Sequence, residues 1–154
     1  MRGAVGWLEL ANPQEALAEL AGAPKSVQGH PDALEVCWQA LSELKDWPQA
    51  LKAARQLITT APERATGYIN QSFALHEMRK TREALVCLLP HSGRFPEVGV
   101  IPYNLACYAC QLNDLETARH WLVRASKILG QGDTKIMVLK DPDLTPLRPM
   151  VRDW

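Results

Sequence analysis

The chain repeats its apolar side chains at a fixed interval of 34 residues. Alanine stands at four such positions, Ala16, Ala50, Ala84 and Ala118. Three further series keep the interval: Leu10, Leu44, Met78 and Leu112; Leu17, Leu51 and Leu85; and Trp7, Leu41, Leu75 and Ala109. Independent series with one period do not arise by chance, and periods of roughly 20–50 residues are typical of proteins built from stacked units. The chain is therefore expected to fold as an array of like units.

Two apolar stripes with helical spacing run through the second unit. The first stripe is Leu34, Cys37, Trp38, Leu41 and Leu44, and the second is Ala50, Leu51, Ala54, Leu57 and Ile58. Both advance by steps of three residues, with an adjacent residue added to the stripe, as one side of a helix does. Each unit is thus predicted to be a pair of helices.

Polar residues and prolines mark where these two helices begin and end. Asp46 can cap the second helix, Pro48 fits its first turn, and Pro62 stops it. Asn12 and Asp114 stand at the matching places in other units. The small alanine of each second helix lets the two helices cross closely. A single hairpin cannot bury its own apolar face, so the hairpins must stack.

This pattern resembles the tetratricopeptide repeat, a helical hairpin of about 34 residues. The closest match is Pro102-Tyr103-Asn104-Leu105-Ala106-Cys107-Tyr108, followed by Asn113-Asp114-Leu115-Glu116-Thr117-Ala118 and by Ala125. The resemblance extends over about residues 5–129 and implies an all-α, right-handed α-solenoid of antiparallel helix hairpins. We expect about 3.5 repeats and a C-terminal capping helix in one domain, 1–154, divided into a partial repeat 5–30, repeats 31–64, 65–98 and 99–132, and a cap 133–154.

Both ends of the chain depart from the repeat. The first unit has only the tail of its leading helix, residues 5–11, and its closing loop 23–30 lacks the proline of later units. At the other end, a short helix is expected from Asp133, followed by a turn capped by Asp141 with Pro142 as its first residue. The sequence leaves open whether residues 140–154 fold back into a binding groove.

The resemblance implies that the first helix of each hairpin lines the concave side, where a partner would bind. The expected groove residues are Glu35, Gln39, Glu43, Ile69, Asn70, Phe73, His76, Glu77, Tyr103, Asn104, Cys107 and Gln111. Such a groove suits a peptide or helix with a basic part and an apolar anchor. Alternatively, Phe73 and Tyr103 fill gaps between helices. Relatives that hold chaperone carboxylates use Lys, Asn and Arg in the groove, and of the matching positions only Asn70 agrees, which disfavours that ligand.

Composition narrows the classes of partner. The 17 basic side chains balance the 17 acidic ones, so no basic field predicts a nucleic acid or an acidic membrane as partner. No stretch approaches the roughly 20 apolar residues that cross a bilayer, and Glu9 interrupts any signal peptide. We therefore expect a cytoplasmic protein whose four cysteines are free thiols.

Residues capable of chemistry form no recognisable constellation. Cys107 and Cys110 make a C-x-x-C in the middle of a predicted helix, where no helix N-terminus activates the thiols and two further zinc ligands are missing. A metal or thiol site there is the least favoured alternative. The sequence predicts no enzyme, no cofactor and no metal, but a scaffold or adaptor. A second alternative is an assembly or chaperone-like subunit that self-associates or joins a partner through Val5, Trp7 and Leu8 at the N-terminal edge.

Overall fold

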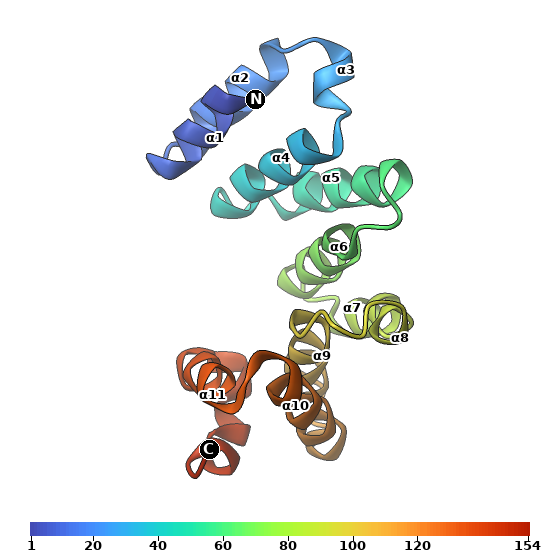
Figure 1. Ribbon diagram of the computed structural model, residues 1–154, viewed down its shortest axis with the longest axis vertical. Helices are drawn as coiled ribbons and strands as arrows, with labels where there is room; N and C mark the ends of the chain where they lie inside the picture. Colours follow the sequence, from blue (N-terminus) through green and yellow to red (C-terminus); the bar gives the residue numbers. More distant parts are fainter. The chain divides into compact units, whose positions relative to one another are not determined.

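The structure, a computed structural model, describes residues 1–154 and consists of helices without any strand, which confirms the all-α prediction (Figure 1). The helices are α1 (Arg2–Glu9), α2 (Pro13–Gly22), α3 (Lys25–Gln28), α4 (Pro31–Glu43), α5 (Trp47–Thr60), α6 (Ala65–Glu77), α7 (Thr81–Leu88), α8 (His91–Arg94), α9 (Val100–Gln111), α10 (Leu115–Leu129), α11 (Gln131–Lys140) and the 3-10 helix η1 (Pro142–Val151).

The chain divides into two compact units. Unit 1 is Met1–Met78 and holds α1 to α6, and unit 2 is Arg79–Trp154 and holds α7 to η1. The division falls inside the third 34-residue period, between its two helices. The expected repeat 65–98 therefore contributes its leading helix to unit 1 and its second helix to unit 2.

The turn inside each hairpin contains a residue in the left-handed conformation. These residues are Ala11, Lys45, Arg79 and Asn113, with φ of 53°, 56°, 64° and 62°, and they too are 34 apart. Behind three of them, a backbone amide reaches back into the helix that has just ended: Asn12 N to Trp7 O at 2.8 Å, Asp46 N to Leu41 O at 2.9 Å, and Asp114 N to Ala109 O at 2.9 Å. This is the Schellman arrangement, which satisfies the last carbonyls of a helix.

The residue that follows the left-handed residue then caps the second helix. Asn12, Asp46 and Asp114 accept hydrogen bonds through their side-chain oxygens from Glu15 N at 3.4 Å, Gln49 N at 3.3 Å and Thr117 N at 3.1 Å. The predicted cap at Asp46 is therefore confirmed. In α7 the corresponding residue is Lys80, whose side chain makes no cap. One residue thus closes the first helix and opens the second in three of the four hairpin turns.

The four repeated alanines are buried, as their predicted place at helix crossings requires. Ala16, Ala50, Ala84 and Ala118 are each 0% exposed, as expected where two helices approach too closely for a larger side chain. Within unit 1 the hairpins also pack on each other, because Ala4 of α1, Leu20 of α2, and Ala33 and Ala40 of α4 share one buried cluster. The second helix of one hairpin thus covers the leading helix of the next.

The C-terminal part of unit 2 closes with α11 and η1. The helix α11 begins at Gln131, two residues before the predicted start, because Gly130 adopts a φ of 93° and ends α10 immediately before it. Asp141 caps η1 as predicted, accepting from Asp143 N at 2.9 Å. The rings of Pro146 and Pro149 would clash with carbonyls one α-helical turn earlier, which disfavours an α-helix, and the segment is a 3-10 helix. Its side chains Leu144, Leu147 and Val151 are buried.

Candidate functional site

Each of the leading helices α4, α6 and α9 carries a set of corresponding residues along one of its own faces. The positions are four residues apart along each helix, which aligns them on one face. We call Glu35, Gln39 and Glu43 the α4 face; Ile69, Phe73 and Glu77 the α6 face; and Tyr103, Cys107 and Gln111 the α9 face. Each member lies 34 residues from its counterpart on the next helix. The α4 and α6 faces belong to unit 1 and the α9 face to unit 2.

The α4 face is acidic, and its charge is partly compensated. Arg64, which precedes α6, places Nη1 2.6 Å from Asp32 Oδ1 and 3.3 Å from Glu35 Oε1. The hydrogen bond to Arg64 lowers the pKa of the Asp32 carboxyl, and the same bond raises the pKa of Arg64. Glu43, at the other end of α4, accepts from Gln39 Nε2 at 3.4 Å and pairs with no cation. The uncompensated negative charge therefore lies at the C-terminal end of α4.

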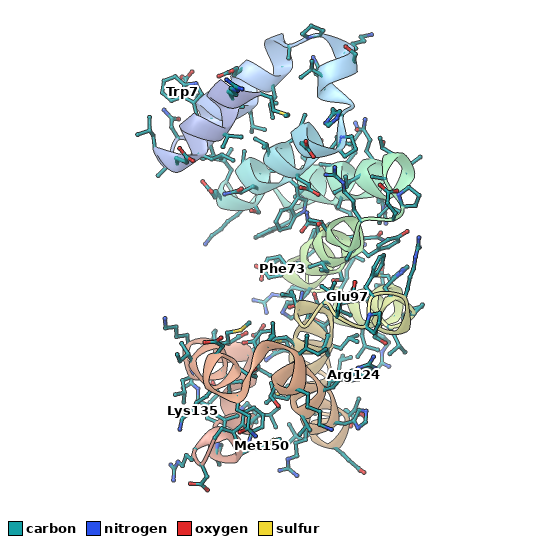
Figure 2. All side chains as sticks on the ribbon, viewed as in Figure 1. Trp7, Phe73, Glu97, Arg124, Lys135 and Met150 are labelled. Carbon is teal, nitrogen blue, oxygen red and sulfur yellow. The ribbon has the colours of Figure 1, made fainter.

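The α6 face centres on Phe73, which Figure 2 labels on α6. This residue is half-buried and belongs to an aromatic cluster. Its ring meets Trp38 of α4 edge-on at 6.2 Å between centroids and Trp47 of α5 at 5.8 Å. Such edge-to-face pairs are favourable beyond the area that they bury. Phe73 thus packs between helices, as the gap-filling interpretation expects. Part of its ring stays exposed, as a groove residue requires.

The two tryptophans of this cluster were not among the predicted site residues. Trp38 could be found in the sequence only as a member of an apolar stripe, and Trp47 only as a neighbour of the cap Asp46. Trp38 Nε1 is buried and has no hydrogen-bond partner. The two tryptophans lie 26 or more positions from Phe73 in the sequence. The 34-residue repeat does not predict that their rings meet.

The remaining predicted residues of unit 1 are less accessible. Asn70 is buried, and His76 is half-buried. Glu77, in contrast, is exposed and forms no ion pair. Among the predicted site residues of unit 1, Gln39, Glu43 and Glu77 are therefore exposed, and Glu35, Ile69, Phe73 and His76 are half-buried.

The α9 face is covered by the C-terminal segment of the chain, residues 141–151. Tyr103 donates its hydroxyl proton to Asp141 Oδ2 at 3.0 Å, and the Cys107 thiol lies 3.5 Å from the same oxygen. Gln111 Nε2 donates to the backbone oxygen of Asp143 at 3.1 Å. Every residue of the α9 face is thus engaged by this segment, while the fourth predicted residue of α9, Asn104, is half-buried. The question that the sequence left open is answered for α9.

The electrostatics of the α9 face keep its donors protonated. Burial, then the neighbouring Cys107 and Asp141, raises the pKa of the Tyr103 hydroxyl. Burial and the Asp141 carboxylate raise the pKa of Cys107 well above its ordinary value, and burial followed by Asp143 raises that of Cys110. The Cys107 thiol donates a hydrogen bond to Asp141, the Cys110 thiol is a buried packing group, and neither has the lowered pKa that a redox or metal-binding thiolate requires.

A hollow of about 410 Å³ in unit 1 lies between α2, α4 and α5. Leu17, Leu20 and Leu34 form its floor, and Cys37 and Lys52 are its titratable residues. No carboxylate or histidine lines it, and burial raises the pKa of Cys37. This hollow offers no acid–base pair and no activated nucleophile.

The N-terminal hairpin exposes apolar side chains of α1 and of the turn after it, including one whose counterparts in later hairpins are buried. Trp7 is 37% exposed, whereas its counterparts Leu41, Leu75 and Ala109 are 8%, 3% and 1% exposed. Leu10 is 72% exposed, and Figure 2 shows Trp7 on α1. Val5 is exposed as well, whereas Leu8 packs into the cluster between α1, α2 and α4.

The fold is that of the tetratricopeptide-repeat proteins. The thermophilic TPR protein TTC0263 of Thermus thermophilus superimposes with a TM-score of 0.73 over 98% of this chain and 92% of its own, at 17% identity. MamA residues 41 to end from Desulfovibrio magneticus RS-1 gives 0.72 over 99% and 94%, at 16% identity. A double mutant described as MamA RS-1 ArsTM gives 0.71 over 94% and 84%, at 17% identity. The chain matches no family model and no curated protein sequence.

None of the helices has both the length and the apolar composition required to cross a bilayer.

Proposed function

We propose that this protein is a non-catalytic interaction module, a scaffold or adaptor that holds a peptide or helix of a partner protein against its leading helices. The observation that carries the proposal is the composition of the α4 and α6 faces. Two exposed carboxylates pair with no cation, Glu43 at the end of α4 and Glu77 at the end of α6, and α6 also carries the half-exposed ring of Phe73.

The carboxylates and the aromatic ring of these two faces determine which kind of partner segment can bind. A half-exposed aromatic ring offers an apolar contact for a leucine or phenylalanine, and such anchors supply most of the binding energy at interfaces. The carboxylates favour a lysine or arginine beside that anchor and speed its approach. The proposed ligand of unit 1 is therefore a segment with a basic residue close to an apolar one. Binding forms and breaks no covalent bond.

A peptide library displayed against the full chain tests this proposal. Enriched peptides should combine Lys or Arg with Leu, Ile or Phe, and their affinity should fall as salt is added. The double variant Glu43→Lys/Glu77→Lys should weaken the enriched peptides by about tenfold or more. The matched control is Glu83→Lys, a reversal at an exposed site of α7 outside these faces.

Charge reversal at exposed sites leaves the buried contacts of the helices in place, so circular dichroism should not distinguish the variants from the parent chain. Enrichment without any basic or apolar preference would sink the proposal. So would unchanged affinity in the double variant.

A second candidate function is assembly through the N-terminal edge, favoured by the exposure of Trp7 and Leu10. At the positions that correspond to Trp7 in later hairpins the side chain is buried, so this edge has the apolar character of a contact surface. Multi-angle light scattering tests this candidate with Trp7→Glu as the disrupting variant and Val86→Glu, exposed on α7, as the control. A monomer at high concentration, or an oligomer unaffected by Trp7→Glu, contradicts it.

A further inference from the structure

The α9 face differs from its counterparts because a polypeptide segment already lies on it. Ile69, Phe73 and Glu77 of the α6 face are at least partly exposed, whereas Tyr103 and Cys107 are each 6% exposed. All three residues of the α9 face direct their polar atoms to residues 141 and 143. The segment therefore occupies the positions where, by the proposed function, a partner would be held.

The contacts define what this face recognises. One carboxylate oxygen, Asp141 Oδ2, accepts from both Tyr103 and Cys107, while the other oxygen caps η1 by accepting from Asp143 N at 2.9 Å. Pro142 sets the first turn, and Leu144 and Leu147 follow three and six residues after the aspartate. Both leucines are buried, to 0% and 1% exposure, in η1, which packs against α9, α10 and α11. Hydrogen bonds to a charged acceptor are the stronger kind, and buried leucines supply apolar area.

We propose that the α9 face is a receptor for a carboxylate-led segment of the form Asp-x-x-Leu-x-x-Leu, filled in this chain by its own residues 141–151. The partner that fits it is a protein segment with the same three groups. Such a segment binds by replacing the internal one. This inference rests on the proposed function, since it names the ligand chemistry of the third leading helix and adds a competitor for it.

Competition between the internal segment and a free peptide sets the peptide concentration at which binding to the α9 face can be measured. The internal segment is attached through α11, so its effective concentration is on the order of millimolar or higher. A free peptide that makes the same contacts must exceed that concentration to displace it. Removing the Asp141 carboxylate weakens only the internal copy, because the residues of the α9 face remain unchanged. A free peptide with an intact aspartate then has the advantage.

The experiment measures binding of a fluorescein-labelled peptide of residues 140–154 to the full chain by anisotropy. The wild-type chain should show no saturation below about 1 mM. Asp141→Ala removes the acceptor of the two hydrogen bonds from α9 and of the capping hydrogen bond from Asp143 N. It should bring the apparent Kd of the peptide down by about 10–100-fold. Asp153→Ala, an exposed acid of the same end of the chain, is the matched control and should behave as the wild type.

Two further variants assign the binding to α9. Tyr103→Phe added to Asp141→Ala keeps the ring and removes the donor, so peptide binding should weaken by about tenfold. A peptide carrying Asp141→Asn should bind the Asp141→Ala chain by a similar factor more weakly. Equal peptide affinity in Asp141→Ala and Asp153→Ala overturns the proposal. Peptide binding that is indifferent to Tyr103→Phe overturns it too, since the peptide then lies elsewhere.

If Asp141→Ala fails to fold by circular dichroism, thiol labelling of the wild-type chain decides. Departure of the segment uncovers Cys107 without unfolding the helices, so its labelling rate should be insensitive to urea well below the unfolding transition. A rate that rises with urea in step with global unfolding would show a fixed cap and refute the proposal. These readouts do not involve Glu43 or Glu77, so this inference and the proposed function of unit 1 can fail independently.

Discussion

Gly67 offers the sharpest test of how closely the helices of unit 1 pack. A Cβ atom at this position of α6 would lie 2.9 Å from Ile58 Cγ1, 3.2 Å from Ile58 N and 3.4 Å from Leu57 Cγ. Non-bonded carbon atoms pack best at about 3.5–4.0 Å. Gly67→Ala therefore forces either the Ile58 side chain or α6 itself to shift, and the backbone atom of Ile58 limits how far the side chain alone can accommodate the change.

The expected free energy has two parts of opposite sign. Alanine in place of glycine inside a helix stabilises by about 0.5–1 kcal/mol. Overpacking of a well-filled contact costs about 1–3 kcal/mol. The two contributions combine to a net loss of between about 0 and 2.5 kcal/mol from the free energy of unfolding. Gly6→Ala on α1 is the matched control, because nothing lies within 4 Å of its added Cβ, and it should stabilise by about 0.5–1 kcal/mol.

Urea unfolding followed by tryptophan fluorescence measures both variants, since Trp7, Trp38 and Trp47 all lie in unit 1. A double-mutant cycle with Ile58→Ala identifies the clash. If Ile58 is the obstacle, its truncation should cost about 1 kcal/mol less in the Gly67→Ala chain than in the parent. A Gly67→Ala variant as stable as Gly6→Ala, with no coupling to Ile58, would refute the close approach of α5 and α6.

Three further predictions concern the hairpin turns. Lys45→Gly should raise the free energy of unfolding by up to about 1 kcal/mol, because glycine accepts the left-handed φ without the Cβ penalty; a loss of stability in urea titrations would contradict this. Lys80→Asp should supply the cap that α7 lacks and gain about 1 kcal/mol, whereas an unchanged unfolding midpoint would show that no cap forms. Hydrogen bonds donated by Thr117 lower the pKa of the Asp114 carboxyl, so the stability that this carboxylate contributes is present above its unfolded pKa and is lost as pH falls through the folded pKa. Asp114→Asn should therefore reduce the loss of stability of unit 2 on acidification below about pH 4, and equal acid losses in the two chains would exclude that role.

The parts of the fold that the sequence predicted are those set by local rules. The period identified the hairpins, and the capping residues Asn12, Asp46 and Asp114 marked where second helices begin. The left-handed turn residues could not be found in this way, because three of the four are Ala11, Lys45 and Arg79, which have no preference for that conformation. At Ala11 and Lys45 the Schellman hydrogen bonds of the turn hold the backbone in that conformation whatever the side chain.

The candidate site was predicted less fully, because its decisive contacts are tertiary. Nothing local to Tyr103 indicates that its hydroxyl meets Asp141, a residue 38 positions away. The same holds for the packing of Phe73 against Trp47. The resemblance supplied the faces of the leading helices, whereas only the structure shows that one of these faces is occupied by the chain itself.

In three of the hairpin turns, one residue both ends the first helix and caps the second, so the turn has a fixed length. With no slack between the two helices, an insertion at Asp46 would rotate α5 by about 100° and turn its leucines toward solvent. Compliance in unit 1 must then reside in the links between hairpins, residues 23–30 and 61–64. Length changes introduced by evolution or by design should accordingly be tolerated in those links and rejected at the hairpin tips.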